Sequence, residues 1–296
     1  MKNPPWTKEE DDILKKNFKI LPLKDLPNVL PGRNYNAIKA RQTFLGICQV
    51  YAKDNNFFTI PNTLNSSIAG FTSSDGHISP PKGKRRTRIF WGINTKDRKL
   101  LEYINFYLKS NYTISDVINE RHMPIMREGG KAYNFVSYVS HLCIASAETL
   151  ADDLLTHWNI PAGAKSLVIG APNITDLDIC LAYIKGLIIG DGTILATDLG
   201  DKVYIKLSML GTVALLNWCK STLERFLGET MDTVHVRPER KGANISILTI
   251  TGLKASRIIH KLNQLENTLK LDRKFKKPEI LKLIERDKLE YPELFR

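Results

Sequence analysis

The sequence predicts an α+β protein in which one αββαββα unit occurs twice, behind a small N-terminal three-helix domain. A glycine-containing stretch recurs at 68–76 and 184–192, strand and helix patterns follow both copies in the same order, and the first 50 residues contain short helical patterns. We expect the two copies to form one pseudo-symmetric body with saddle-shaped antiparallel sheets. The expected ranges are 1–50 for the helical domain, 51–65 for a linker, 66–296 for the main domain, 66–158 and 176–270 for its repeats, and 277–290 for a C-terminal helix.

The N-terminal domain is predicted to contain three short helices. Thr7 precedes the acidic run Glu9–Asp12, which suits the positive end of a helix dipole. A second helix is expected near 23–30, ended by Pro31-Gly32, and a third over 35–45. In the linker that follows, we expect Phe57, Phe58 and Ile60 to dock on the main domain.

Two stretches of this domain resemble a Myb/SANT-type domain over about 45 residues: Trp-Thr-Lys-Glu-Glu-Asp from Trp6 and Leu-Pro-Gly-Arg-Asn-Tyr-Asn-Ala-Ile-Lys-Ala-Arg from Leu30. The resemblance implies that the third helix enters the DNA major groove. It places Lys39, Ala40 and Thr43 at base edges and Arg33 and Arg41 at phosphates. The alternative is a SANT-like module that binds protein. Gln42 stands where the family usually has its last core tryptophan.

The recurring stretch is predicted to be the last turns of a helix followed by a break. In both copies small residues recur four apart, on one helix face, where they allow two helix backbones to approach closely. These small residues are Gly70, Ser74, Gly186 and Gly190. Gly76 and Gly192 end the two stretches, where we expect left-handed backbone.

An aspartate precedes each final glycine, and the two, Asp75 and Asp191, are 116 residues apart (191 − 75). A carboxylate at a helix C-terminus faces the negative end of the dipole, so its recurrence favours a function over a structural role. If the helices pack by their small faces, the two carboxylates meet and repel each other unless a cation lies between them. Oxygen ligands suit Mg²⁺, with Mn²⁺ as the alternative ion.

These stretches, Ile68-Ala-Gly-Phe-Thr-Ser-Ser-Asp-Gly76 and Ile184-Lys-Gly-Leu-Ile-Ile-Gly-Asp-Gly192, resemble the two motifs of a LAGLIDADG homing endonuclease with both copies on one chain. The departures from the motif are Ser73, Ser74, Lys185 and Ile189. The resemblance implies the LAGLIDADG fold, a monomer, and site-specific double-strand breaks in a long DNA target, as in intron homing.

The same resemblance implies how the site is built. Asp75 and Asp191 would hold the divalent metal, with the main-chain carbonyls of Ser74 and Gly190 as further ligands. Lys96, after the first long strand, resembles the family position of a catalytic lysine. Its counterpart in the second copy is Leu210, without a base, which predicts unequal cleavage of the two strands.

The segments after the motifs predict matching elements. A strand with Ile89, Trp91 and Ile93 on one face follows the first motif, and a strand at 202–208 follows the second, with Val203, Ile205 and Leu207 on one face. Further elements are expected at 98–109, 121–127, 133–140 and 145–155, and at 213–226, 233–237, 244–251 and 254–265.

The polar faces of the two long strands are basic and contain no acid, which favours a sheet that lies in a DNA groove. Basic segments also follow the last helix of each repeat, where they would meet backbone phosphates or a hydrolytic water, or else form surface loops. The candidate DNA contacts in the main domain are Arg86, Arg88, Asn94, Lys165, Lys202, Tyr204, Lys206, Arg237, Lys270 and Lys274.

Composition agrees with a nucleic-acid partner. The 296 residues carry a formal charge of +12 with a pI near 9.4, and the mean hydropathy is −0.22. No apolar run approaches the ~20 residues that span a bilayer, and the four cysteines are isolated. We expect an intracellular protein, cytoplasmic in a bacterial or phage context or else in an organelle, with double-stranded DNA as partner and no membrane.

Two alternatives stay open. A basic protein without a polyanionic partner has the same charge. A LAGLIDADG-derived splicing maturase or DNA-binding regulator that no longer cuts DNA has the same motifs, although a pure binder has no need of two repelling carboxylates.

Overall fold

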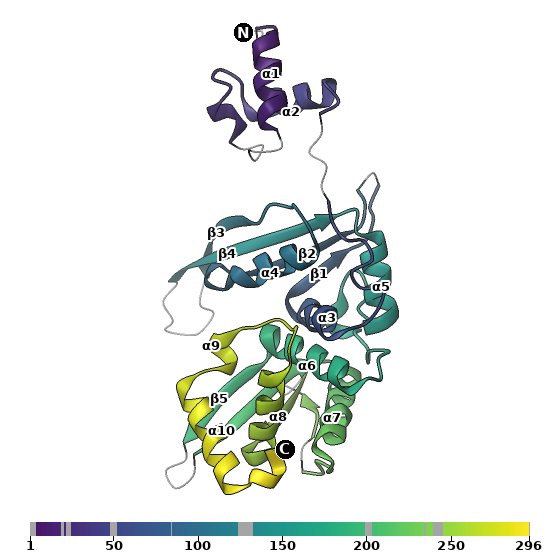
Figure 1. Ribbon diagram of the computed structural model, residues 1–296, viewed down its shortest axis with the longest axis vertical. Helices are drawn as coiled ribbons and strands as arrows, with labels where there is room; N and C mark the ends of the chain where they lie inside the picture. Colours follow the sequence, from purple (N-terminus) through teal and green to yellow (C-terminus); the bar gives the residue numbers. More distant parts are fainter. Residues whose placement is uncertain are drawn as a thin grey trace. The chain divides into compact units, whose positions relative to one another are not determined.

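The computed structural model describes residues 4–18, 21, 25–47, 52–83, 85–123, 133–198, 203–233, 235–238 and 245–295. The chain forms two compact units, Met1–Lys53 and Asp54–Arg296, each with its own hydrophobic core (Figure 1). No described helix is long and apolar enough to cross a membrane.

The first unit contains α1 (Lys8–Asn17), the 3₁₀ turn η1 (Leu26–Asn28) and α2 (Tyr35–Phe44). Thr7 caps α1 in a capping box, in which its hydroxyl accepts from the Glu10 N–H at 3.2 Å and its own N–H donates to the Glu10 carboxylate at 2.9 Å. The second predicted helix is only one 3₁₀ turn in the described residues. Prolines at 27 and 31 leave little chain between them for α-helical hydrogen bonds. The core of this unit consists of Leu14, Leu26, Leu30 and Ile38.

The second unit begins where the linker was predicted. Its Asp54 N–H donates to the Leu108 carbonyl at 2.7 Å, and Phe58 is fully buried with its ring edge-on to Trp158. Docking is therefore confirmed for Phe58 and for Phe57, which is partly buried against the same core, whereas Ile60 is 77% exposed. Asn62 then caps the first motif helix in a second capping box, with Asn65.

Both repeats have the predicted αββαββα order. The first contains α3 (Thr63–Asp75), β1 (Gly76–Ser79), β2 (Arg88–Asn94), α4 (Lys99–Tyr107), β3 (Ser115–Met123), β4 (Tyr133–Ala145) and α5 (Glu148–Trp158). The second contains α6 (Leu177–Asp191), β5 (Thr193–Asp198), β6 (Val203–Gly211), α7 (Val213–Leu227), β7 (Arg237–Pro238), β8 (Ser246–Thr251) and α8 (Gly252–Gln264). The sheets are antiparallel with strand orders β1-β2-β4-β3 and β5-β6-β8-β7, so they share one topology, as expected of a duplication.

The sheets bury the faces that the period-two patterns predict. Ile89, Trp91 and Ile93 of β2 are buried, as are Ile205 and Leu207 of β6. Val203, at the start of β6, is partly exposed and lies outside the core. The predicted strand 121–127 is β3, which starts earlier, at residue 115, and its predicted end falls outside the described residues. The predicted strand 233–237 is the two-residue β7.

Short elements connect and close the repeats. They are η2 (Thr95–Asp97), η3 (Lys165–Leu167), α9 (Asp272–Phe275), α10 (Pro278–Glu290) and η4 (Pro292–Phe295). The helix α10 packs on α8, β5 and β6. It buries Ile280, Leu283 and Ile284, which are spaced three and four apart and so share one helix face.

Candidate active site at the paired helix ends

The two motif helices, α3 and α6, pack against each other along their small residues. A Cβ atom on Gly70 would lie 2.0 Å from the Tyr183 carbonyl oxygen, and one on Gly186 would lie 1.9 Å from that of Ser67. Further along, a Cβ on Gly190 would lie 1.8 Å from the Ser74 hydroxyl. The helices therefore run in the same direction in backbone contact, as the spacing of small residues predicts, and their C-terminal ends lie together.

The glycines that end the helices differ from the prediction. Gly76 has φ −85° and ψ 164°, and Gly192 has φ −81° and ψ 159°, so both are extended and not left-handed. Their need for glycine is steric. A Cβ would lie 2.7 Å from the Thr72 carbonyl oxygen at Gly76 and 2.5 Å from the Ile188 Cα at Gly192, since each chain turns at once into the next strand.

Asp75 and Asp191 are the last residues of these helices. Asp75 reaches toward the end of α6, because a Cβ on Gly190 would lie 3.3 Å from its Oδ2. The pKa of Asp75 is raised to about 6, mainly by burial and then by the negative charge of Asp191, against the opposite effect of Lys274 and Lys165. Asp75 thus feels the charge of Asp191 across the helix pair, and burial together with this repulsion outweighs the effect of the two lysines.

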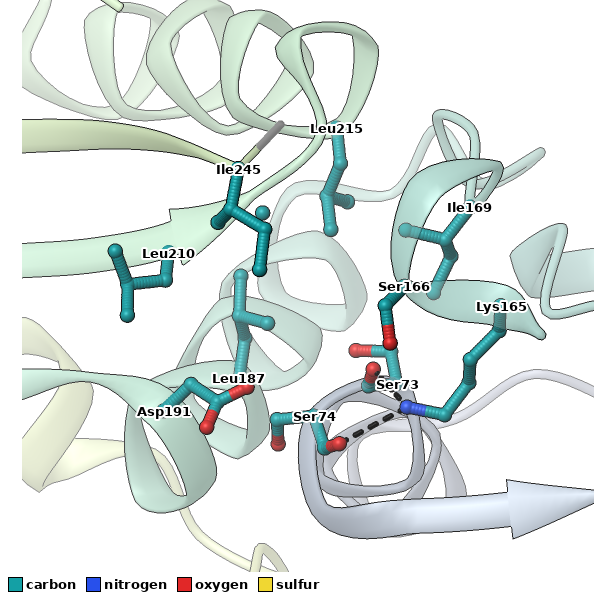
Figure 2. A pocket seen from close by; sticks show the side chains of 11 residues that line it. Ser73, Ser74, Lys165, Ser166, Ile169, Leu187, Asp191, Leu210, Leu215 and Ile245 are labelled. Atoms are coloured by element: carbon teal, nitrogen blue, oxygen red, sulfur yellow. Dashed lines mark hydrogen bonds between the residues drawn. The ribbon is translucent and has the colours of Figure 1, made fainter. Parts of the chain in front are cut away.

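A buried lysine caps the end of α3. Lys165, in η3, is 5% exposed and donates to the carbonyls of Ser73 at 2.5 Å and Ser74 at 2.9 Å (Figure 2). Burial lowers the pKa of this lysine, while Asp191 and Asp75 raise it. Its ammonium group therefore neutralises part of the negative charge at the helix end.

A second lysine caps the end of α6 in the same way. Lys274, in α9, donates to the carbonyls of Ile188 at 3.0 Å, Ile189 at 2.7 Å, Gly190 at 2.6 Å and Gly192 at 2.9 Å. Burial lowers its pKa to about 8. The sequence placed both lysines at equivalent points after the repeats, but it did not show that they bind helix carbonyls.

The candidate donors at the helix ends are all oxygen atoms, the ligand type that suits a hard divalent cation. The described residues contain no group of three or more His, Cys, Asp or Glu side chains that could hold a metal. Two carboxylates, Asp75 and Asp191, remain. The carbonyls of Ser74 and Gly190 each accept from a lysine and keep a second lone pair.

Each carboxylate lines its own cavity. The cavity of about 210 Å³ at Asp75 is also lined by Asn94, Asp97 and Arg273, of which the sequence predicted only Asn94. The cavity of about 160 Å³ at Asp191 is lined by Lys165 and mostly apolar side chains (Figure 2). Lys96, the predicted catalytic lysine, is exposed on η2 and lines neither of these cavities.

The predicted DNA contacts of the sheets fall on the faces turned away from the core. Arg88 and Asn94 are exposed, Tyr204 and Lys206 are half-buried, and Arg237 is exposed on β7. Cross-strand partners on these faces are uncharged, as for Thr251 opposite Lys206. Among the described side chains of these two faces, none is acidic.

The remaining candidates of the main domain lie elsewhere. Arg86 is exposed in the segment before β2, and Lys202 lies outside the described residues. Lys270 lines a separate cavity of about 60 Å³ with Lys185 and Phe275.

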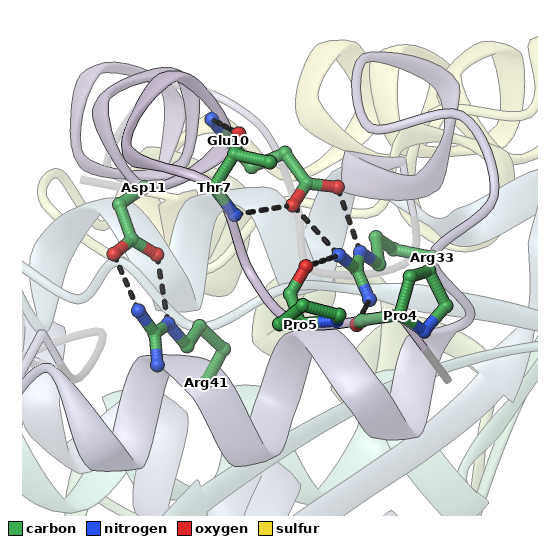
Figure 3. A network of polar contacts seen from close by, with 7 residues as sticks. All are labelled: Pro4, Pro5, Thr7, Glu10, Asp11, Arg33 and Arg41. Atoms are coloured by element: carbon green, nitrogen blue, oxygen red, sulfur yellow. Dashed lines mark hydrogen bonds and ion pairs between the residues drawn. The ribbon is translucent and has the colours of Figure 1, made fainter. Parts of the chain in front are cut away.

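In the first unit, the two arginines expected at phosphates are held by internal ion pairs (Figure 3). Arg33 is 6% exposed, donates to both Glu10 oxygens at 2.7 Å and donates to the carbonyls of Pro4 and Pro5. The hydrogen bonds that Glu10 accepts from Arg33 and from the Thr7 N–H lower its pKa to about 2. Arg41 pairs with Asp11 at 2.5 Å.

Both guanidinium groups lie over the ring of Trp6, so this network closes the unit around its tryptophan. Lys39 and Thr43 are instead exposed on α2.

No protein-family model and no curated protein matches the chain, but solved structures are similar to it. One is the homing endonuclease I-WcaI bound to its DNA recognition sequence, with a TM-score of 0.47 and 13% identity over 86% of this chain and 98% of that chain. Another is the LAGLIDADG meganuclease I-AabMI bound to uncleaved DNA, with a TM-score of 0.42 and 14% identity over 79% of this chain and 93% of that chain.

A third is an I-DmoI variant in complex with its target DNA in the presence of 2 mM Mg, with a TM-score of 0.37 and 15% identity over 67% of this chain and 90% of that chain. Such identities, with TM-scores below 0.5, transfer neither a family nor a function, so the assignment of function rests on the residues of this chain.

Proposed function

We propose that this chain is a metal-dependent endonuclease that cuts both strands of DNA. The observation that carries the proposal is the meeting of Asp75 and Asp191 at the ends of two helices in backbone contact. Burial and the second carboxylate raise the pKa of Asp75, and a divalent cation would relieve this unfavourable charge, which supports the proposal.

Asp75 and Asp191 would hold Mg²⁺ or Mn²⁺, with the carbonyls of Ser74 and Gly190 as further oxygen donors. When bound, the ion supplies polarisation of the scissile phosphate and a lower pKa for an attacking water. The chain's own part is to fix the two carboxylates. Backbone contact between α3 and α6 sets their separation, and Lys165 and Lys274 hold the helix ends by their carbonyls.

The solvent faces of the two sheets are the proposed DNA surface. Their described side chains lack acids, and the whole chain carries a charge of +12, so DNA phosphates meet a favourable field. The residues of these faces proposed to contact DNA are Arg88, Asn94, Tyr204, Lys206 and Arg237. Arg86, before β2, and Lys202, outside the described residues, are proposed as further DNA contacts from the sequence alone.

For the first unit we propose DNA contact through the exposed face of α2. Asn36, Lys39, Ala40 and Thr43 are exposed and spaced three and four apart, so they share one helix face. Arg33 and Arg41 are left out of this surface, because Glu10 and Asp11 hold their guanidinium groups.

The motif resemblance extends the proposal to a homing endonuclease that acts on one long site. A selection from a randomised double-stranded DNA library tests it, with cut ends captured and sequenced in Mg²⁺ and, in parallel, in EDTA. We expect one long consensus with ends that appear only in Mg²⁺. Selective binding of one sequence without cut ends in Mg²⁺ or Mn²⁺ would contradict the endonuclease and favour the non-cleaving DNA-binding alternative.

A further inference from the structure

An ion pair joins the two repeats beside the candidate active site. The Arg273 guanidinium, from α9, donates through Nε to Asp97 Oδ1 at 2.6 Å and through Nη2 to Asp97 Oδ2. Asp97 follows β2 in the first repeat and is 7% exposed, whereas the Arg273 side chain is 47% exposed. The carboxylate is therefore buried under a guanidinium that still faces solvent.

This guanidinium has free donors and opens on the cavity of Asp75. Arginine has five N–H donors, of which Asp97 takes two, and no other acceptor among the described residues takes the remaining three. Arg273 and Asp97 line the cavity of about 210 Å³ that also contains Asp75 and Asn94. A planar guanidinium fixed at one edge is suited to bind a phosphate with its other donors.

The cavity of Asp191 differs in this respect. Apolar side chains, including Leu187, Leu210 and Leu215, line it together with Ser73, Ser74 and Ser166. The Ser73 and Ser74 hydroxyls donate to helix carbonyls, and so does Lys165, its one described cation. Both halves end their motif helix on an aspartate, half-buried at Asp75 and exposed at Asp191, but only the cavity of Asp75 has a cation with free donors beside the carboxylate.

We propose that Arg273 contacts the scissile phosphate in the half-site of Asp75, with Asp97 as its positioning residue, so that the strand in that half-site is cut faster. This inference rests on the proposed endonuclease function and refines it. In the hydrolysis, water forms a bond to phosphorus, one P–O ester bond breaks, the attacking water loses a proton to solvent and the leaving oxygen gains one. Arg273 neither gives nor takes that proton; it stabilises negative charge on the phosphate oxygens.

The test follows each DNA strand separately. On the target obtained by selection, Arg273→Ala should slow one strand by about 10- to 100-fold, the range for a lost charge-assisted hydrogen bond in a transition state, and leave the other within about threefold. Nicked DNA should accumulate. Asp97→Asn, which keeps the shape but loses the charge, should slow the same strand by less.

Exchanging the two charges distinguishes a role of Arg273 in cleavage from a purely structural role of the ion pair. Asp97→Arg with Arg273→Asp can restore the ion pair and the melting temperature, but it moves the guanidinium to the other repeat, so the slowed strand should stay slow. Affinity for intact DNA in Ca²⁺ should remain within about threefold in every variant, because the sheets hold the DNA. Lys276→Ala, one residue beyond the end of the same helix and outside both cavities, is the matched loss of one charge.

The outcomes are distinct. Three results would overturn the inference: Arg273→Ala slows both strands equally, it leaves the strand ratio unchanged, or the charge swap restores the slowed strand. Each would mean that the ion pair between Arg273 and Asp97 has only a structural role, while the endonuclease proposal stands. A wild-type protein that cuts neither strand would overturn both.

Discussion

At the scale of single residues, Asp75 is a carboxyl group whose ionisation the fold disfavours. Its pKa is raised from 3.8 to about 6, so the folded protein binds this proton more tightly than the unfolded chain. The fold therefore gains stability from Asp75 as pH falls from above 6 toward 3.8, and the ionised carboxylate is unfavourable at pH 7.5.

Asp75→Asn should accordingly stabilise the metal-free protein at pH 7.5 by about 1–3 kcal/mol. Thermal unfolding in EDTA measures this, and the gain should disappear near pH 4, where both forms are neutral. Asp152→Asn, an exposed acid on α5, serves as the control and should change little. A lower melting temperature for Asp75→Asn at pH 7.5 would contradict the claim that the ionised Asp75 carboxylate destabilises the metal-free fold.

Lys185 departs from the motif, and we expect its buried charge to lower the stability of the fold. It is 3% exposed inside α6, donates to the Thr268 hydroxyl at 2.8 Å, and burial lowers its pKa to about 8. Because the pKa of Lys185 is lower in the folded protein than in the unfolded chain, the fold gains stability as pH rises from below 8 toward 10.5.

Lys185→Met should therefore raise the free energy of unfolding at pH 7 by about 1–3 kcal/mol, and less at pH 10. Thr268 keeps its hydrogen bond to the Leu265 carbonyl. Denaturant titration at both pH values gives the answer, with exposed Lys282→Met on α10 as control. Loss of stability at pH 7 would instead mean that the ammonium group makes a favourable interaction in the fold.

At the scale of elements, the contact between α3 and α6 decides whether the carboxylates meet. Gly186→Ala should destabilise the protein by about 3 kcal/mol or more, because the new Cβ would lie 1.9 Å from the Ser67 carbonyl oxygen and backbone must move. Gly92→Ala is the control, since its Cβ would meet only side-chain atoms of His141 and Phe90 at 3.2 Å. Equal effects in chemical denaturation would argue against a tight helix interface.

The elements that the sequence predicted are those with a strong local pattern. The alternation of Ile89, Trp91 and Ile93, and the small residues of the motifs, determined a buried strand face and a helix interface. β1 was not located, because it has four residues, begins at Gly76 and buries a single large side chain, Ile78.

The site was predictable only in part. Asp75 and Asp191 stand out because each breaks a local rule at the same place in a repeat. The contact of Lys274 with Gly190 spans 84 residues, and that of Arg273 with Asp97 spans 176, so neither leaves a local pattern. Arg33 and Arg41 look like free basic residues in the sequence, and their acidic partners are 23 and 30 residues away.

At the scale of the whole molecule, the two units have separate cores, so residues 54–296 should fold without the first 53. Removal of residues 1–53 should shorten the protected DNA on one side of the site and weaken binding, because Lys39 and the rest of the α2 face are lost. Cleavage at the same position should persist, since both aspartates lie in the second unit. An unchanged footprint would assign the first unit to a protein partner.

The central claim is that Asp75 and Asp191 together make this chain a metal-dependent nuclease. The most direct measurement is cleavage of the selected target in Mg²⁺ by the wild type, Asp75→Asn and Asp191→Asn, with binding to the same DNA measured in Ca²⁺. We expect the wild type to cut both strands, and each variant to bind within about threefold and to lose cleavage by about 10³-fold or more, the scale of losing a metal that polarises the phosphate. Cleavage at the wild-type rate by either variant would contradict the account.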